Sequence, residues 1–219
     1  MSFKKPISHA LLIATLCAAP MWAFADSVND AVQSIQSRWA KINYDFDTSE
    51  RAHAFAELAE EAHELAEQSP NRAEPLIWEG IVLSTQAGSM RGFSMLKAGG
   101  VAKAARDRLL EAEKIDPTAM QGSIYTSLGS LYAEAPGWPI SFGDKDKARA
   151  YLQRALELNP NGIDSNYFWG KFLQGQQDFA AARSAYEKAL AAPNRPTRPR
   201  ADAGRRAEIH EALESLPKS

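Results

Sequence analysis

The chain has 219 residues and a formal net charge of −2, and 45% of its residues are hydrophobic. This length and composition suit one globular domain with a core of its own. The weakly acidic balance offers no basic surface for nucleic acid, so we expect no nucleic-acid binding. Cys17 is the only cysteine, so an internal disulfide framework is excluded.

The first 25 residues have the pattern of a secretory signal peptide. Lys4-Lys5 precede an apolar run that starts at Ala10, and the run ends at Ala23-Phe24-Ala25, an A-x-A cleavage pattern. An uncleaved membrane anchor is the alternative, although the run is short for a membrane span. We therefore expect residues 1–25, with the cysteine, to be removed. The mature protein is then expected in a bacterial periplasm, without stable membrane insertion.

Two amphipathic segments follow, and we expect them to be helices that form a degenerate first pair. They span residues 30–45 and 50–70, and the second ends at Pro70. On the second segment, His63 stands at helical spacing from Glu60 and Glu67, an arrangement that could hold a divalent metal. A solvated helix face is the more common meaning of such a pattern, so we predict no metal site.

Segment 85–100 mixes apolar residues with four glycines. Met90, Phe93, Met95 and Leu96 stand there at nearly helical spacing. Such a stripe belongs to a core more often than to a binding surface, so we expect these residues to be buried. The alternative is an adaptable apolar lip over a binding groove.

Two later segments share one pattern of large and small residues. Gly129 and Gly170 each stand inside an apolar first helix, and each is followed by an Ala-marked second helix that ends at a proline, Pro160 or Pro193. The two glycines are 41 positions apart, and removing a seven-residue insertion leaves 34, the period of the tetratricopeptide repeat (TPR). A fainter copy surrounds Gly80. The chain resembles the TPR superfamily from about Pro75 to Pro193.

This resemblance implies an all-α fold in which antiparallel helix pairs stack into a short TPR-type superhelix. The repeat domain would span residues 26–192. Residues 193–219 are expected to form a Pro/Arg-rich linker and a C-terminal capping helix with a polar outer face. The linker arginines, Arg195, Arg198 and Arg200, could contact an anionic lipid or partner. We instead expect them to pair with Asp202, Glu208 and nearby acidic faces.

The concave face of the superhelix is the candidate binding surface. We expect the first helices of the pairs to present Thr126, Ser130, Tyr167, Lys171 and Gln174 there, for a peptide or a small ligand. Some TPR proteins grip a peptide carboxylate with a basic and Asn-rich clamp. Because Lys171 is the single cation among these positions, that clamp is not expected.

The stretch "PGWPISFGD", residues 136–144, contains the seven-residue insertion of the middle repeat. Asp144 is expected to cap the helix that follows, and Trp138 and Phe142 to pack back against neighbouring helix ends. Direct ligand contact by these aromatic rings, together with Tyr132, is the alternative. The stretch is similar to a P-G-W-P-x-x-F-G-D loop in secreted bacterial TPR proteins and, more distantly, to the T-component of TRAP transporters, thought to bind small ligands beside a substrate-binding protein.

The chain shows no nucleophile–base pair, phosphate-binding loop or C-x-x-C pair. We therefore predict a non-catalytic protein without a cofactor. Its expected function is protein or peptide interaction, as a scaffold or adaptor of the cell envelope. The alternative is a small-ligand-binding accessory of a periplasmic transport system.

Overall fold

The computed structural model describes residues 21–217, so most of the predicted signal peptide lies outside the described residues. Within them, the chain forms nine α-helices and no β-strand. These are α1 (Met21–Asp45), α2 (Thr48–Glu67), α3 (Ala73–Ser89), α4 (Met95–Ile115), α5 (Ser123–Glu134), α6 (Lys145–Leu158), α7 (Ile163–Gly175), α8 (Phe179–Leu190) and α9 (Pro199–Ser215). Short 3-10 turns span Gly92–Ser94 and Ala119–Gly122. The all-α prediction is confirmed.

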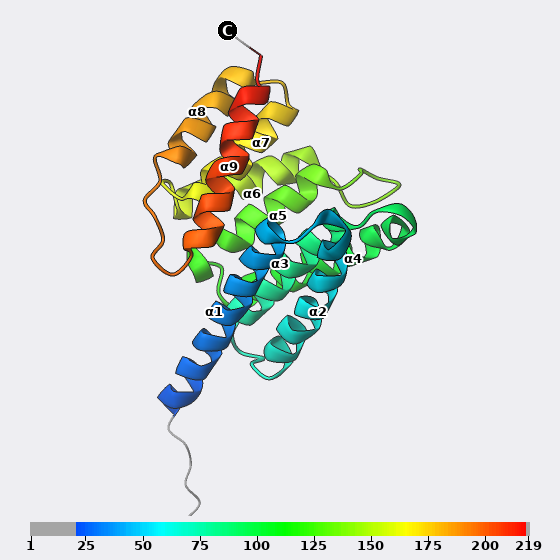
Figure 1. Ribbon diagram of the computed structural model, residues 1–219, viewed down its shortest axis with the longest axis vertical. Coiled ribbons are helices and arrows are strands. Elements are labelled where there is room, and N and C mark those ends of the chain that lie inside the picture. Colours follow the sequence, from blue (N-terminus) through cyan, green and yellow to red (C-terminus); the bar gives the residue numbers. More distant parts are fainter. Residues whose placement is uncertain (1–20, 218–219) are drawn as a thin grey trace, which may run out of the picture.

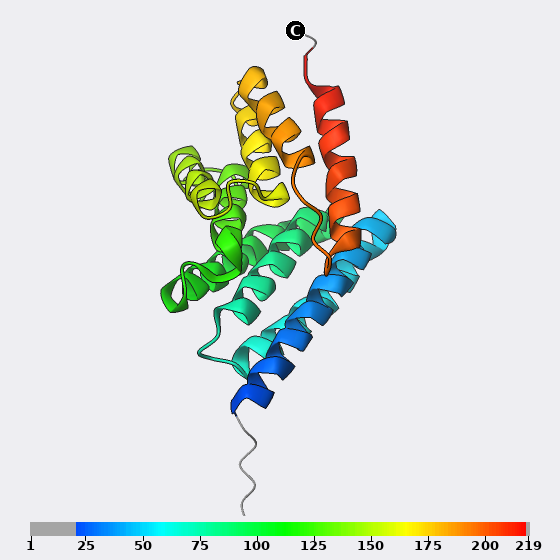
Figure 2. The same ribbon diagram turned by 90° about the vertical axis from the view of Figure 1, so that its left-hand side faces the viewer.

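The helices pack as successive pairs that stack into a curved array (Figures 1 and 2). Helix α3 packs on α4, α5 on α6 and α7 on α8, and each first helix also contacts the first helix of the next pair. Helices α1 and α2 extend the array at its N-terminal end. This is the TPR-type superhelix that the repeat spacing predicts.

Glycines allow the close packing within the pairs. A Cβ atom at Gly129 would lie 2.5 Å from Cγ of Leu152, and one at Gly170 would lie 2.7 Å from the ring of Tyr186. Both distances are too short for real contacts, so the second helix of each pair packs directly against the backbone of the first. The interpretation of these glycines as points of close approach is confirmed.

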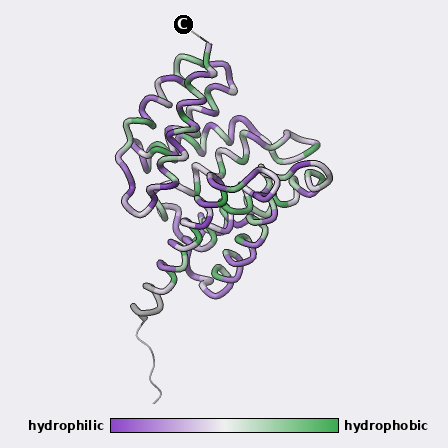
Figure 3. Tube along the Cα trace, in the orientation of Figure 1, coloured by the Kyte–Doolittle hydropathy of each residue, from purple (hydrophilic) through white to green (hydrophobic). Residues whose placement is uncertain are grey.

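The hydrophobic core extends along the whole array of helices and is not a single central cluster. Hydrophobic and hydrophilic positions alternate along the helices (Figure 3), and the apolar sides face the neighbouring helices. Trp39, Phe55 and Trp78 fill the N-terminal part, Leu128 and Leu152 belong to the middle, and α7, α8 and α9 close the C-terminal part. No helix within residues 21–217 is long and apolar enough to cross a membrane.

The expectation that segment 85–100 is core is only partly correct. Met90 is buried, but Met95 is 57% exposed and Leu96 is 87% exposed. The first turn of α4 is exposed on nearly every side, because no other described helix covers it. The side chain of Phe93 lies outside the described residues.

The C-terminal helix does more than cap the last repeat. As predicted, it is a single helix, but α9 packs on α7 and α8 and also reaches α1 at the opposite end of the array (Figure 2). At this crossing, a Cβ atom at Gly204 would lie 2.4 Å from the ring of Tyr44. Helix α9 therefore connects the two ends of the superhelix, and two of its polar residues, Asp202 and Arg205, are buried.

A buried carboxylate lies on α3, directly before Gly80 of the fainter repeat copy. Glu79 on α3 is 5% exposed, and its Oε1 atom lies 3.0 Å from Nδ1 of His63 and accepts a hydrogen bond from Nε of Arg108 at 3.0 Å. The Oε2 atom has no hydrogen-bond partner among the described residues. His63 is thus engaged by Glu79, and the described residues contain no group of three His, Cys, Asp or Glu side chains that could hold a metal. Burial raises the pKa of Glu79 despite the nearby Arg108.

We expect Glu79→Leu to raise the free energy of unfolding by about 1–3 kcal/mol at neutral pH, measured by urea unfolding. Because the pKa of Glu79 is raised, burial costs the ionised carboxylate more than Arg108 and His63 return, so an apolar side chain removes a net cost. Arg108 is 27% exposed and keeps Glu111 as a partner, so it is not left as a buried, unpaired charge. Because the pKa is raised in the fold, the advantage of the variant should shrink as pH falls toward 4.5. Glu79→Gln, which still buries a polar group, should gain much less. A loss of more than about 1 kcal/mol in Glu79→Leu contradicts this account.

Candidate functional site

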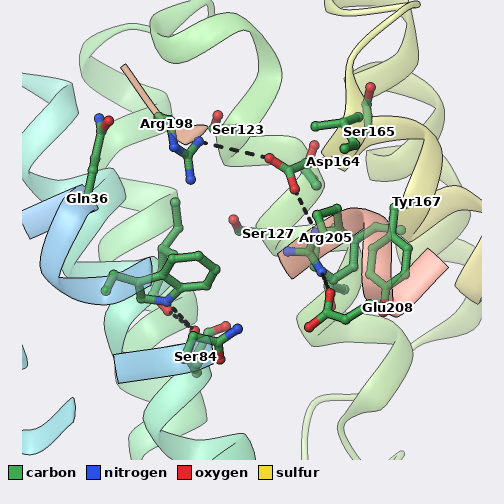
Figure 4. A pocket seen from close by; sticks show the side chains of 18 of the residues that line it. Gln36, Ser84, Ser123, Ser127, Asp164, Ser165, Tyr167, Arg198, Arg205 and Glu208 are labelled. Atoms are coloured by element: carbon green, nitrogen blue, oxygen red, sulfur yellow. Dashed lines mark hydrogen bonds and ion pairs between the residues drawn. The ribbon is translucent and has the colours of Figure 1, made fainter. Parts of the chain in front are cut away.

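A chamber of about 830 Å³ lies between the concave face of the superhelix and α9. Helices α1, α2, α3, α5 and α7 contribute to its wall, and the linker before α9 and α9 itself line it as well (Figure 4). Its wall includes Gln36, Trp39, Trp78, Ser84, Thr85, Ser127, Tyr167, Arg198, Arg205 and Glu208. We refer to this cavity as the chamber. Its volume lies within the range of about 300–1,000 Å³ that is usual for ligand sites.

The start of α5 places a row of hydroxyl groups on the chamber wall. Met120 and Gln121 adopt left-handed backbone angles, with φ of 51° and 50°, directly before Gly122 at φ 83°. Such angles are uncommon for residues other than glycine, and they concentrate at functional sites. The resulting tight reversal begins α5 at Ser123. Because helical residues three or four apart share a face, Ser123, Thr126, Ser127 and Ser130 all line the chamber.

An arginine cluster forms one part of the wall. Asp164, in the first turn of α7, accepts hydrogen bonds from Nη1 of Arg195 at 2.7 Å and from Nε of Arg205 at 2.9 Å. Arg198 lies farther away, with Nη1 4.0 Å from Oδ2 of Asp164. Figure 4 shows Arg198 and Arg205 both directed toward this carboxylate. We refer to Asp164 and these three arginines as the arginine cluster.

Two further carboxylates complete the ion pairs. Asp202 accepts a hydrogen bond from Nε of Arg195 at 2.7 Å, and Glu208 pairs with Arg205. The expectation that the linker arginines pair with Asp202 is therefore confirmed for Arg195, whereas the partner of Glu208 is Arg205 of α9. Arg200 lies outside this group and pairs with Asp45 on α1 at 3.3 Å.

The cluster shifts the proton affinities of its members. Burial alone would raise the pKa of Asp164, but the guanidinium groups of Arg205, Arg195 and Arg198 hold it well below its usual range. Burial opposes the charge of Arg205 as well, yet Asp164 raises the pKa of that guanidinium. For Arg198, burial prevails, and its pKa is lowered. Arg198 is therefore the least compensated charge of the three.

The structure brings only part of the predicted site together. Thr126, Ser130, Tyr167 and Lys171 line the chamber. Gln174 does not, because its amide is used within the fold, accepting a hydrogen bond from the Tyr186 hydroxyl at 2.7 Å and donating one to Ser215 at 3.1 Å. Thr126 donates its own hydroxyl to the Gly122 carbonyl at 3.1 Å.

The chamber contains more cations than the predicted groove positions supply. Arg51, Arg91, Arg195, Arg198 and Arg205 line the same chamber as Lys171. Sequence reasoning missed Arg195 and Arg198 because it assigned them to a linker, and it missed Arg205 because it did not foresee that α9 returns across the concave face. One signal was present, since Gly204 beside Arg205 in a helix indicates a close approach by another element.

The aromatic residues of the 136–144 loop lie outside the chamber. Tyr132 is buried, and its ring stacks on Tyr151 at 5.6 Å between ring centres. Phe142 packs edge-on against Tyr132 at 5.5 Å and beneath the guanidinium group of Arg106 at 4.7 Å. Asp144 accepts hydrogen bonds from the backbone of Asp146 and Lys147, both at 3.0 Å. The predicted cap by Asp144 is confirmed.

Trp138 departs from the packing expectation, because its side chain is 89% exposed. The loop closes through its own backbone instead. Gly143 donates to the Pro136 carbonyl at 2.9 Å, and Ile140 donates to the Gly137 carbonyl at 3.1 Å. Since these bonds and Phe142 hold the base of the loop, the indole at its tip is not needed for closure.

Trp138→Ala should therefore change the free energy of unfolding by less than about 0.5 kcal/mol, as for other exposed side chains. Phe142→Ala, in the same loop, should cost about 1–2 kcal/mol because it removes the contacts with Tyr132 and Arg106. Thermal and urea unfolding of both variants would test this difference. Equal losses would show that the indole supports the fold after all.

Comparison with known proteins agrees with the fold. A family model described as tetratricopeptide repeat matches residues 140–161, which include α6. The chain is similar to TTC0263, a thermophilic TPR protein of Thermus thermophilus, with a TM-score of 0.55 and 18% identity over 89% of this chain and 95% of that chain. At this identity, the similarity shows the TPR-type fold alone. No curated protein matches the chain significantly.

Two other solved structures are less similar. MamA matches with a TM-score of 0.43 and 21% identity over 76% of this chain and 89% of that chain. PilF of Pseudomonas aeruginosa matches with a TM-score of 0.36 and 16% identity over 86% of this chain and 91% of that chain.

Proposed function

We propose that this chain is a non-catalytic interaction protein that binds a segment of a partner protein in the chamber. The proposal follows from its TPR-type fold, in which the first helices of the pairs share one cavity. Repeat proteins bind partners on their concave surfaces, and TPR-type proteins are generally scaffolds. The observation that carries the proposal is that α3, α5 and α7, the first helices of three successive pairs, all line this one chamber. We further propose that the protein is exported by its N-terminal segment and acts in the periplasm as an adaptor of the cell envelope.

The lining suits an extended peptide. Ser84, Ser127 and Ser130 offer hydroxyl groups, which donate and accept hydrogen bonds and so match the N–H and C=O groups of a peptide backbone. Trp39 and Tyr167 add aromatic surface for side chains. The wall thus resembles the polar and aromatic surfaces that recognise peptides, with no nucleophile–base arrangement needed.

A variant that fills the chamber tests the proposal. Ser127→Trp places an indole in the chamber, whereas Ser34→Trp adds the same group on the exposed face of α1. Partners are captured from the periplasmic fraction, identified by mass spectrometry, and confirmed by direct binding of the purified pair. We expect Ser127→Trp to lose the partner and Ser34→Trp to retain it. Retention by both folded variants would overturn the proposal.

One observation favours the alternative of a small-ligand carrier that serves a transport system. Helix α9 shields the chamber, and about 830 Å³ is a volume typical of small-molecule sites. A thermal-shift screen of periplasmic metabolites separates the two functions. A ligand present at 100 times its Kd adds about 2.7 kcal/mol to the stability of the fold. A stabilising metabolite that Ser127→Trp no longer binds would support the carrier.

A further inference from the structure

Two buried nitrogen donors on the chamber wall have no acceptor. Nε of Arg198 and Nε1 of Trp78 are both buried, and neither finds a hydrogen-bond partner among the described residues. They belong to one corner, because the guanidinium group of Arg198 lies 5.2 Å from the centre of the Trp78 ring. Trp78 is only 1% exposed. A buried donor without an acceptor is costly, so an acceptor from outside the chain is the expected partner for this corner.

The charge of Arg198 also lacks a close counter-ion. Arg195 and Arg205 each contact Asp164 and a second carboxylate at hydrogen-bonding distance, whereas Arg198 comes no closer than 4.0 Å to Asp164. Removing Arg198 would therefore leave the other ion pairs of the arginine cluster intact. This arginine is the member of the cluster that is available to a ligand.

Helix ends reinforce the preference of the corner for negative charge. Arg198 directly precedes α9, and Asp164 lies in the first turn of α7, so the N-termini of both helices lie at the cluster. Neither helix has a side-chain cap. Helix N-termini carry a partial positive charge and free N–H groups, which favour anions.

The other charged side chains of the chamber wall are also mostly positive. Arg51 and Arg91, which line the chamber beyond this corner, have no carboxylate within 4.0 Å among the described residues, and Arg51 donates instead to the Phe46 carbonyl. Six basic and three acidic side chains line the chamber in a chain whose net charge is −2. A positive cavity in an acidic protein raises the local concentration of anions.

We propose that the corner formed by Arg198 and Trp78 binds a carboxylate of the ligand. A planar carboxylate has two acceptor oxygens, which suit the planar donor groups of a guanidinium, and Arg198 holds its guanidinium over the Trp78 ring. Asp164 and Glu208 line the same region, and they would repel a dianion such as phosphate more strongly than a monoanion. The inference rests on the proposed use of the chamber, and the carboxylate belongs either to the C-terminus of a peptide or to a free organic acid.

The test uses pooled N-acetylated tetrapeptides, prepared as free acids and as C-terminal amides, together with free mono- and dicarboxylic acids. Retention on the immobilised full chain is read by mass spectrometry, and affinities follow from calorimetry. We expect free-acid peptides to bind at least tenfold more tightly than their amides. Arg198→Gln should weaken the acids about 10- to 100-fold and leave the amides unchanged, as expected for loss of a charge-assisted hydrogen bond.

Two further variants keep the result interpretable. Arg200→Gln removes an exposed arginine two positions away, outside the chamber, and should bind as the wild type does. Trp78→Phe keeps an aromatic ring but removes the indole N–H, so it should weaken the acids several-fold. If Trp78→Phe fails to fold, Arg198→Lys provides the second measurement, since it keeps the charge but loses the planar donor and should bind acids less well.

The possible outcomes distinguish the carboxylate site from the proposed function of the chamber. Equal binding of acids and amides, no binding of any acid, or unchanged binding by Arg198→Gln would overturn the carboxylate site. Equal binding of acids and amides that Ser127→Trp abolishes would leave the chamber as a peptide site and remove only the inference. Binding of free organic acids without peptides would support the corner and the small-ligand carrier, and would overturn the peptide function.

Discussion

An Asp164→Asn variant is expected to lose about 3–5 kcal/mol of unfolding free energy, the usual cost of removing one partner of a buried ion pair. The Asp164 side chain is 27% exposed, and Arg205, which donates to it, is 9% exposed. Without the carboxylate, Arg195 and Arg205 each lose a close counter-ion, and Arg198 loses its nearest one. Urea unfolding measures the loss, and hydrogen exchange should show that α9 is the region that opens more readily.

Asp146→Asn is the matched control. Asp146 is the second residue of α6, as Asp164 is the second residue of α7, so both favour the positive end of a helix. Asp146 is exposed and has no ion pair with any described residue. Its replacement should cost about 0.3–1 kcal/mol. If Asp164→Asn costs no more than this control, the arginine cluster does not hold α9.

The Asp164 carboxylate also makes the free energy of unfolding depend on pH under acidic conditions. Since the pKa of Asp164 is lower in the fold than its ordinary value of 3.8, its contribution is complete above that value and is lost as pH falls below it. The difference between wild type and Asp164→Asn should therefore stay constant above about pH 4 and shrink at lower pH.

Gly204→Ala is expected to destabilise the protein by about 1–3 kcal/mol, although alanine normally stabilises a helix. The added Cβ would lie 2.4–2.5 Å from three atoms of the Tyr44 ring, including the atom at its base, so the ring cannot swing aside. Either α9 or α1 must move. Thermal unfolding and hydrogen exchange in α9 measure the effect.

Gly100→Ala supplies the comparison. Gly100 is also inside a helix, α4, but nothing lies within 4 Å of its added Cβ. This variant should gain up to about 1 kcal/mol from helix propensity alone. A stabilised Gly204→Ala would mean that α9 does not press against α1.

Local patterns predicted the helix pairs, because Gly129, Gly170 and the prolines after each pair report on contacts between helices close in sequence. The cap by Asp144 follows from equally local chemistry. The chamber depends on contacts between residues more than a hundred positions apart, such as Tyr44 with Gly204, and a single sequence has no local periodicity for these. The exposed Trp138 was missed for another reason, since a large aromatic ring is usually buried and here the backbone closes the loop without it.

The contact between α9 and α1 also affects how stability is distributed along the repeat array. In an open array, each repeat interacts only with its neighbours, so the ends fray first and stability is a sum of local contributions. Here α9 also contacts α1, so the two end helices of the described array are joined, and its stability is no longer a sum of contributions from neighbouring repeats. Because α9 and the linker before it also line the chamber, the contact that joins the two ends of the array bounds the ligand site as well.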